Sequence, residues 1–413
     1  MPGEVGVLLS PQDCENILSK FDENATLAKY EINRISGKVF GFLAAHYYVT
    51  IEYTRNGQNV VYSHRFFLKT MPTANETQRA YIESMGIFKK EILNYKNFLS
   101  EFSQLTKVPF VAKYYFSKSD CLVIEDLSSL NYQVCNMEYL GHRKCVGALN
   151  ALARLHASSI IFEEARSTKE QPYRLNEHFH EELTEATFSF QEGHVRNKWC
   201  KTSTRCLEQL SRYFTNNEEV ARKIKQYVFS ENGLKKYIRP SRTYRNTVCH
   251  DDLWCNNMMF NERDECMLLD FQLSRYTPPV FDVLLLLHLG TTASYLNKNI
   301  EYLLDLYYNF LTNELSRYDL KIEEIISKDD FLASAEEYTL PALVEAGLYG
   351  TNVYLPESVS SIVVSCPENF LEFAMKDRPS FVVKEFERNQ EYRERFSTVL
   401  KPLFHIIEEI EIN

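Results

Sequence analysis

The chain has 413 residues, which corresponds to about two to three typical domains and is enough to bury a hydrophobic core. It carries 46 Lys and Arg against 56 Asp and Glu, a formal net charge of −10, which argues against a protein that binds nucleic acid through its phosphate backbone. Hydrophobic residues make up 45% and charged residues 25%, as in ordinary globular proteins, so a disordered chain is also disfavoured.

The amino terminus lacks a basic segment followed by a long apolar stretch, so we expect no signal peptide. The strongest apolar run, residues 280–289, is interrupted by Asp282 and His288 and is shorter than the roughly 20 residues that cross a bilayer. The ten cysteines include no C-x-x-C pair, which indicates reduced thiols. We therefore expect a monomeric, cytoplasmic protein without a membrane or nucleic-acid partner.

The first third of the chain contains runs rich in β-branched and aromatic residues, which predict four short strands: 39–53, 60–69, 110–116 and 121–126. The dipeptide Asn56-Gly57 lies between the first two runs and is a strong signal for a hairpin turn. Residues 76–102 predict a helix, because apolar residues recur there at intervals of three or four. This part of the sequence therefore predicts a small sheet with one helix against it.

From about residue 139 the pattern changes from strand to helix. Apolar periodicity predicts a long helix that ends near His156, and charged helical segments fill 174–238. A compact β island follows, with three short strands predicted at 247–250, 258–260 and 266–271. Pro278 and Pro279 then introduce further helices toward the carboxyl end.

These elements predict an α+β fold with two lobes. Residues 1–127 form a β-rich small lobe, and residues 128–413 form a mainly helical large lobe with the embedded β island. A cleft between two such lobes is where ligands usually bind.

The most informative stretch is VCHDDLWCNNMMF, which is followed by MLLDFQ. His250, Asp252 and Asn257 have the spacing H-x-D-x-x-x-x-N of a phosphotransferase catalytic loop. Asp270 comes thirteen residues after Asn257, across a hairpin that returns it to the same end of the island. In such enzymes the first carboxylate orients the attacking hydroxyl, while the amide and the second carboxylate hold Mg²⁺ on the nucleotide phosphates. We therefore expect Asp252 to be catalytic and Asn257 and Asp270 to bind the metal.

A simpler interpretation exists for each acidic residue of this stretch taken alone. Asp side chains often close turns, so Asp251 and Asp252 could do so here, and Asp270 could merely end a strand. The joint spacing, with an apolar strand running directly into Asp270, favours the phosphotransferase.

HDDLWCNNMMF with LLDFQ resembles the ecdysteroid kinase-like family, whose hallmark is H-[GN]-D-x-W-x-N-N followed by D-F-Q. The resemblance covers nearly the whole chain, because the other landmarks of the family follow in the same order. It implies a protein-kinase-like fold, related to that of choline and aminoglycoside kinases. It also implies phosphorylation, by ATP with Mg²⁺ as cofactor, of a hydroxyl on a small molecule such as an ecdysteroid. One position departs: Asp251 stands where the family commonly has Gly or Asn, and its charge is expected to crowd the loop or alter the field near the metal.

Lys69 ends the strand-like run HRFFLK, where a kinase places a lysine against the nucleotide phosphates. A strand-end lysine that reaches solvent is the simpler interpretation. Glu91, however, lies three residues after Phe88 and four before Tyr95, within the apolar stripe of the predicted helix. A carboxylate on an inward stripe needs a partner, because burying it unpaired is costly. Lys69 is the obvious partner, and the resemblance assigns the same pair; a solvated Glu91 at the margin of the stripe is the alternative.

Two further parts of an ATP site leave weaker signals. CLVIEDLS resembles the hinge of the family, where backbone groups around Glu125 and Leu127 face adenine, although a plain core strand explains it equally well. SGKVFG supplies Gly37 and Gly41 for a phosphate loop but contains no G-x-G-x-x-G, so chance explains these glycines equally well.

Four residues near these motifs are expected to support the site rather than to react. His250 is expected to support the conformation of the catalytic loop and not to transfer protons. Asp282 resembles a family aspartate that stabilises the large lobe. Trp254 is expected to pack beneath the catalytic loop. His156 is expected to end its helix with its ring satisfied by the core.

Two rival functions remain open. A protein kinase places a long activation segment ending in A-P-E after the metal-binding aspartate, but here only residues 271–280 separate Asp270 from the next apolar helix. A small-molecule alcohol is therefore the expected substrate, and no motif names it. The second rival is a degenerate kinase fold that binds a nucleotide or small ligand without turnover. Asp251 and the sparse glycines favour this rival, whereas the complete catalytic set opposes it.

Overall fold

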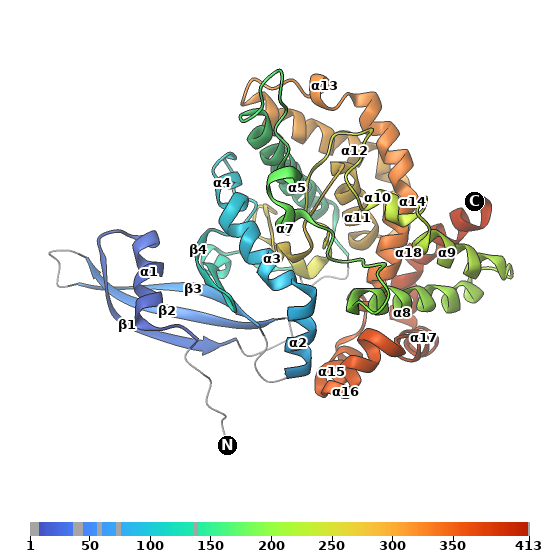
Figure 1. The fold of residues 1–413 in the computed structure, drawn as a ribbon, viewed down its shortest axis with the longest axis horizontal. Helices are drawn as coiled ribbons and strands as arrows, with labels where there is room; N and C mark the ends of the chain where they lie inside the picture. Colours follow the sequence, from blue (N-terminus) through green and yellow to red (C-terminus); the bar gives the residue numbers. More distant parts are fainter. Residues whose placement is uncertain (1–7, 36–43, 56–59, 72–75, 136–138, 412–413) are drawn as a thin grey trace.

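The computed structural model describes residues 8–35, 44–55, 60–71, 76–135 and 139–411. A five-stranded sheet at one end of the molecule adjoins a larger, mostly helical part (Figure 1). The predicted α+β fold with two lobes is therefore confirmed. Gly37, Gly41 and the predicted turn Asn56-Gly57 lie outside the described residues.

The small lobe is built on an antiparallel sheet of β1 (Ala25–Arg34), β2 (Ala45–Arg55), β3 (Val61–Thr70), β4 (Tyr114–Lys118) and β5 (Cys121–Glu125). The strands are arranged in the order β1-β2-β3-β5-β4. Lys69 of β3 pairs in register with His46 of β2 on one side and with Leu122 of β5 on the other. Lys69 therefore lies in the middle of the sheet and not at a free edge.

The two faces of the sheet have different neighbours, because successive side chains of a strand point to opposite sides. Phe66 and Leu68 of β3 pack in one apolar cluster with Ile17 of α1 (Pro11–Phe21), which covers that face. Phe67 and Lys69 point the other way and line a cavity that faces the large lobe. The strand alternation alone thus directs Lys69 inward.

The helix predicted at 76–102 is not continuous, so the prediction is wrong in this respect. α2 (Glu76–Met85) ends before Gly86, whose φ of +68° is a left-handed conformation that glycine adopts without strain. α3 (Ile87–Asn94), the π-helical turn η1 (Tyr95–Leu99) and α4 (Ser100–Phe102) follow. Glu91 lies on α3 and is buried, as its place in the apolar stripe predicts.

Three features of the small lobe differ from the prediction. α1 and β1 are additional, and α1 begins with a capping box between Ser10 and Asp13, a signal that is visible in the sequence. The strand predicted at 110–116 begins later, as β4, because Val111 instead forms a parallel bridge to Leu268 of the large lobe.

The central helix of the large lobe, α5 (His142–Glu164), is longer than predicted. His156 does not end it but lies buried in its interior. By length and composition α5 could span a membrane, but 83% of its most apolar stretch is buried inside the protein, as expected for a core helix.

The predicted β island is present in the large lobe. β7 (Thr247–Cys249) pairs with β10 (Arg275–Thr277), and β6 (Gln133–Val134), β8 (Met258–Phe260) and β9 (Cys266–Leu268) form a second small sheet. At the end of the β8–β9 hairpin, the N–H of Leu269 donates to the carbonyl of Asn257 at 2.9 Å. The hairpin therefore returns the residue before Asp270 to the residue that closes the loop motif. α11 (Pro279–Gly290) begins at Pro279, as predicted.

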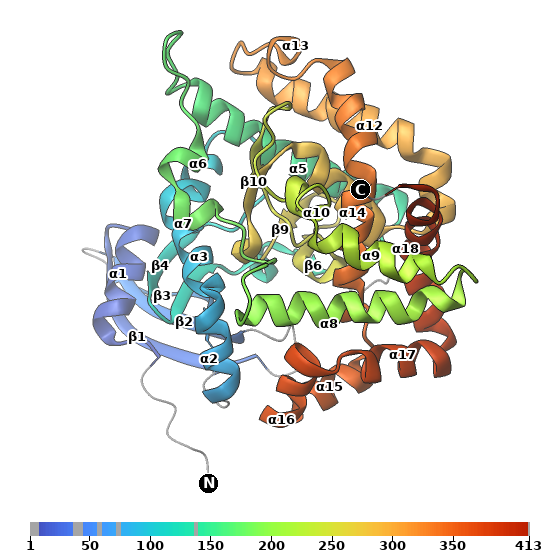
Figure 2. The ribbon, with the colours of Figure 1, turned by 45° about the vertical axis from the view of Figure 1, so that its right-hand side comes forward.

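The remaining elements of the large lobe surround the island and are, in chain order, η2 (Leu127–Leu130), α6 (Leu175–His178), α7 (His180–Leu183), α8 (Val195–Leu210), η3 (Ser211–Tyr213), α9 (Glu219–Phe229), α10 (Leu234–Tyr237), η4 (Cys255–Asn257), η5 (Phe271–Leu273), α12 (Ala293–Ser316), α13 (Ile322–Ile325), α14 (Lys328–Val353), α15 (Glu357–Ser365), α16 (Pro367–Leu371), η6 (Glu372–Lys376), α17 (Pro379–Arg388) and α18 (Gln390–Glu409). Figure 2 shows α15, α16 and α17 along one side of the molecule, below α8. Tyr81 of α2 meets Phe370 of α16 with the ring centroids 5.2 Å apart. The two lobes are therefore in contact on this side, in addition to the bridge between Val111 and Leu268.

Candidate active site

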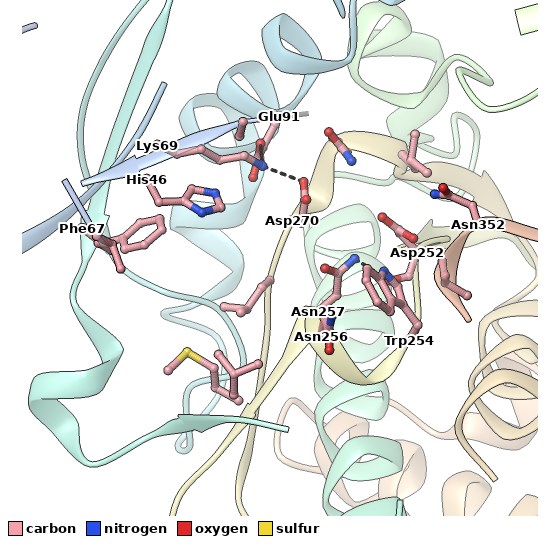
Figure 3. A pocket seen from close by; sticks show the side chains of 18 of the residues that line it. His46, Phe67, Lys69, Glu91, Asp252, Trp254, Asn256, Asn257, Asp270 and Asn352 are labelled. Carbon is pink, nitrogen blue, oxygen red and sulfur yellow. Dashed lines mark hydrogen bonds and ion pairs between the residues drawn. The ribbon is translucent and has the colours of Figure 1, made fainter. Parts of the chain in front are cut away.

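A cavity of about 290 Å³ lies between the sheet and the helices (Figure 3). We call its two walls the sheet side and the helix side. The sheet side includes His46, Phe67, Lys69, Glu91, Ile124 and the segment 125–128. The helix side is mostly aromatic and includes Tyr81, Trp199, Tyr349, Val363, Phe370 and Phe373. Asp252, Asn257 and Asp270 lie between the two sides and face the same cavity.

Lys69 is held on the sheet side by two carboxylates. Its Nζ lies 2.6 Å from Oε2 of Glu91 and 2.7 Å from Oδ1 of Asp270. Burial alone would lower the pKa of Lys69, but Asp270 and Glu91 raise it above its ordinary value, so the amine stays protonated. Burial raises the pKa of Glu91 to about 7, although Lys69 opposes that rise. The predicted pairing of Lys69 with Glu91 is therefore present.

Asp270 belongs to a turn that is fastened to the helix carrying Glu91. The backbone of Asp270 has a φ of +65°, which is uncommon for a residue other than glycine. Immediately after it, the carbonyl of Phe271 accepts a hydrogen bond of 2.7 Å from Nδ2 of buried Asn94 on α3. This bond couples the position of Asp270 to that of Glu91.

Asp282, at the start of α11, anchors the beginning of the catalytic-loop motif. Its carboxylate accepts hydrogen bonds from the backbone N–H groups of His250 at 2.6 Å and Asp251 at 3.0 Å. It also lies 3.1 Å from Nε2 of His156, whose other ring nitrogen contacts the hydroxyl of Tyr307 at 2.7 Å. Burial alone would raise the pKa of Asp282, but the hydrogen bond from His156 lowers it below its ordinary value. Asp282 is therefore an ionised anchor.

His250 joins the loop to the strand that leads into Asp270. Its Nδ1 accepts from the N–H of Asp252 at 3.2 Å, so its proton resides on Nε2, which donates to the carbonyl of Leu269 at 2.8 Å. Burial lowers the pKa of His250, which favours this neutral form. The ring thereby sets the spacing between Asp252 and Asp270.

Asp252 and Asn257 present oxygen atoms to the cavity beside Asp270. Burial, followed by the charge of Asp270, raises the pKa of Asp252 to about 7. Nδ2 of Asn257 donates to the backbone carbonyl of Asp252 at 2.9 Å, which leaves Oδ1 as the amide atom that can accept a ligand. The three oxygen-bearing side chains singled out by the loop spacing thus line one cavity.

Asp251 does not crowd the loop, so that expectation is wrong. Its carboxylate turns into the core and pairs with Arg275 at 2.5 Å, and Arg275 also pairs with Glu345 at 2.8 Å and with Glu185 at 3.1 Å. The backbone of Asp251 has a φ of +68°, which explains why Gly or Asn suits this position. The negative charge of Asp251 is therefore neutralised by a buried arginine.

Two other predicted residues lie at the rim of the cavity. Glu125 and Leu127 line the sheet side where β5 ends, next to Asp126, which pairs with Arg65 at 2.6 Å. Trp254, which was expected to pack beneath the loop, is half-buried against the core and also lines the cavity (Figure 3).

The sequence predicts that helices between 174 and 240 and after 290 line the pocket, and they do, but it did not single out their individual residues, above all Arg196 and Arg378. Both are buried and line the cavity near Trp199. They belong to segments far from the catalytic loop in the chain, and no motif surrounds either of them. Arg275 and Glu345 were missed for the same reason, because a buried ion pair between distant segments leaves no local pattern.

The model of the ecdysteroid kinase-like family matches residues 39–320 of this chain. The match spans more than half of the 413 residues and contains the described residues of the site from Lys69 to Asp282. A comparison with curated proteins finds no match.

Several solved structures are distantly similar to this chain. Choline kinase LicA from Streptococcus pneumoniae is 11% identical with a TM-score of 0.41, and the alignment covers 93% of this chain and 99% of that one. Spectinomycin phosphotransferase APH(9)-Ia, in complex with ADP and spectinomycin, is 12% identical with a TM-score of 0.40 and coverages of 95% and 99%. An ethanolamine kinase from Plasmodium vivax is 13% identical with a TM-score of 0.38 and coverages of 97% and 86%. Because these similarities are so distant, they carry no information about the residues of the site, whose roles rest on the geometry of this chain.

Proposed function

The chain belongs to the ecdysteroid kinase-like family, and we propose that it transfers the γ-phosphate of ATP to a hydroxyl group of a small molecule. Membership of the family supports a small-molecule phosphotransferase. The observation that carries the proposal is the convergence of Asp252, Asn257 and Asp270 on one cavity, opposite the amine of Lys69. Phosphoryl transfer requires positioned oxygen ligands and a cation of this kind.

Each predicted residue has a role in this proposal. Asp252 accepts a hydrogen bond from the acceptor hydroxyl and orients it as the new O–P bond forms and the bond to the bridging oxygen of ATP breaks. Lys69, held by Glu91, contacts the nucleotide phosphates. His250 and Asp282 hold the loop without exchanging protons with the substrate. The backbone around Glu125 and Leu127 receives the adenine.

The donor set fits a magnesium ion. Mg²⁺ prefers oxygen ligands, and Oδ1 of Asn257 and the carboxylate of Asp270 are oxygen donors at the same cavity. The side chain of Asp270 is 27% exposed, so a ligand can reach it. When bound, the ion supplies positive charge to the phosphate oxygens.

The acceptor is proposed to be a lipophilic alcohol, such as an ecdysteroid or a compound of similar shape. The aromatic helix side supports an apolar body for the acceptor. The short segment between Asp270 and α11 leaves little chain to dock a protein substrate. No disulfide joins any of the ten cysteines, all of which lie in the described residues, and this supports the further proposal of a cytoplasmic, reducing environment for this chain, acting as a monomer.

The test is a turnover assay on the purified chain with ATP and Mg²⁺. We expect slow release of phosphate from ATP, and faster consumption of ATP with a suitable sterol or phenolic alcohol. Asp252→Asn should reduce turnover by about 10²-fold or more, because it removes the carboxylate that orients the hydroxyl. Removing Mg²⁺ with a chelator should stop the reaction.

Asp305→Asn is the matched control, since it makes the same change of charge on the exposed surface of α12. Turnover that survives Asp252→Asn as it survives Asp305→Asn would refute the catalytic assignment. A wild-type chain that binds ATP but never turns it over would instead favour the binding protein without catalysis.

A further inference from the structure

The helix side of the cavity contains two cations without a neutralising carboxylate. Arg196 lies near the start of α8 and Arg378 directly before α17, and their residues are 6% and 1% exposed. Among the described residues neither forms an ion pair, whereas Lys69 on the sheet side has two carboxylate partners. The Nε of Arg196 donates to the carbonyl of Ala186 at 2.8 Å, which uses one donor of its guanidinium group.

The hydrogen bonds of Arg378 also go to neutral acceptors. Its Nε donates to the carbonyl of Phe373 at 3.3 Å. Its Nη1 donates to Oγ of Ser203 at 2.8 Å and to Oγ1 of Thr351 at 3.0 Å. Within the part of the chain that the structure describes, no acceptor is found for Nη2 of Arg378 or for the two terminal nitrogens of Arg196, and both side chains line the cavity.

The two positive charges are close to the same aromatic ring. The Cζ atoms of Arg196 and Arg378 lie 5.3 Å and 5.1 Å from the ring centroid of Trp199. An aromatic face attracts a cation, but much more weakly than a carboxylate does. Burial lowers the pKa of Arg378 to about 10, so its guanidinium stays charged at neutral pH. Two buried guanidinium groups in one wall, neither of them in an ion pair within the described residues, point to an anion as their ligand.

We propose that Arg196 and Arg378 form an anion-binding subsite, and that the acceptor is an apolar hydroxyl compound that also carries an acidic group such as a carboxylate. This inference rests on the proposed function, which identifies the occupant of the helix side as the acceptor, and it narrows that acceptor from lipophilic alcohols in general, neutral ecdysteroids included, to those that carry an acidic group. The planar guanidinium group presents paired N–H donors that match the oxygens of a carboxylate or sulfonate. The apolar body packs against the aromatic residues of the same wall, and a cationic acceptor is repelled.

The test compares two fluorescent probes that differ by one acidic group. 8-Anilinonaphthalene-1-sulfonate is anionic, and N-phenyl-1-naphthylamine has the same rings without the sulfonate. We expect the full chain to bind the anionic probe more tightly. Arg196→Met and Arg378→Met should each weaken the anionic probe by about tenfold or more, since each removes charged hydrogen bonds, and should leave the neutral probe nearly unchanged.

Three controls locate the effect. Val363→Trp fills the cavity and should displace both probes. Arg212→Met removes an exposed arginine that also lies over an aromatic ring, Tyr213, and should change neither affinity. If Arg378→Met fails to fold, Arg196→Met and the charge-preserving Arg378→Lys still decide, and Arg378→Lys should retain most of the preference.

The outcomes separate this inference from the proposed function. Equal binding of both probes by the wild-type chain, or an unchanged preference in Arg196→Met, overturns the subsite. Loss of ATP affinity in the arginine variants with the probe preference intact also overturns it, because the arginines then serve the nucleotide. Asp252→Asn should lose turnover and keep the preference, so a failure of catalysis alone leaves the subsite standing.

Discussion

Two buried clusters of this protein each place one cation among carboxylates, but they differ in their access to a ligand. Lys69 with Glu91 and Asp270 borders the cavity, and the side chain of Asp270 is 27% exposed. The second cluster surrounds Arg275, which is 2% exposed, and its partners Asp251 and Glu345 are 1% and 0% exposed. The cluster around Lys69 can therefore exchange a partner for a ligand, whereas the cluster around Arg275 can only stabilise the fold.

The difference follows from where the elements end. Lys69 and Asp270 lie at element ends that meet at the cavity, so their charges are shared with whatever enters it. Arg275 begins a strand that pairs with β7, directly beneath the catalytic-loop motif, and helix α14 covers it with Glu345. The candidate site and the scaffold of the large lobe therefore contain the same kind of ion pair. The two clusters differ in how far they are exposed to the cavity.

The largest effect is expected when the buried cluster around Arg275 is broken. Arg275→Met leaves Asp251 and Glu345 buried without their cation, which should lower the free energy of unfolding by about 3 to 5 kcal/mol. Urea denaturation followed by circular dichroism measures this loss.

Lowering the pH should reduce the deficit of Arg275→Met. Burial raises the folded-state pKa of both Asp251 and Glu345, so their protonated forms fold more favourably and the penalty appears as the pH rises. Arg317→Met breaks an ion pair nearer the surface and should cost no more than about 1 kcal/mol. Equal losses in both variants would contradict the comparison.

Breaking the cluster at the cavity should affect turnover more than stability. Lys69→Met should reduce turnover by about 10²- to 10³-fold, because the cation opposite the transferred phosphate is lost. Its folding penalty should be smaller than that of Arg275→Met, since Asp270 reaches solvent, whereas Asp251 and Glu345 are both buried. Parallel phosphate-release and urea measurements separate the two effects, and a folding penalty as large as that of Arg275→Met would refute the distinction.

A moderate effect is expected at the position where the chain departs from the family. Asp251→Asn keeps a residue type that accepts the positive φ but loses the ion pair with Arg275, which retains Glu345 and Glu185. We expect a loss of about 1 to 3 kcal/mol in stability and a smaller loss of turnover than in Lys69→Met. Asp251→Gly should cost more stability than Asp251→Asn, because it removes every hydrogen bond of the side chain. Thermal denaturation compares the two variants, and an unchanged stability in both would show that the buried pair contributes nothing.

The smallest effect is expected when the hydrogen bond between α3 and the turn that carries Asp270 is removed. Asn94→Ala removes the hydrogen bond to the carbonyl of Phe271 and should lower stability by about 1 kcal/mol. Because this bond couples Asp270 to Glu91, turnover should fall as well, although less than in Lys69→Met. Asn299→Ala, which removes a side-chain bond to the carbonyl of Tyr295 on α12, provides the matched control and should leave turnover unchanged. Equal turnover in both variants would exclude the coupling.

Much of the site was predictable because its signals are local. The spacing of His250, Asp252 and Asn257 lies within one loop, and the inward place of Glu91 follows from the periodicity of one helix. The continuous helix at 76–102 was mispredicted, since apolar spacing persists across Gly86 while the backbone reverses its φ there. The expected crowding by Asp251 was wrong because the direction of a side chain depends on a distant partner.

Periodicity, turn chemistry and motif spacing act over a few residues, and they were sufficient for the class of fold, the β island and the residues expected to carry chemistry. Tertiary packing decided what lies opposite those residues. It placed Arg275 and Glu345 around Asp251, and it brought Arg196 and Arg378 to the same aromatic ring. The physical reason is that a buried charge is stabilised by groups that are close in space, and its partners can come from any part of the chain.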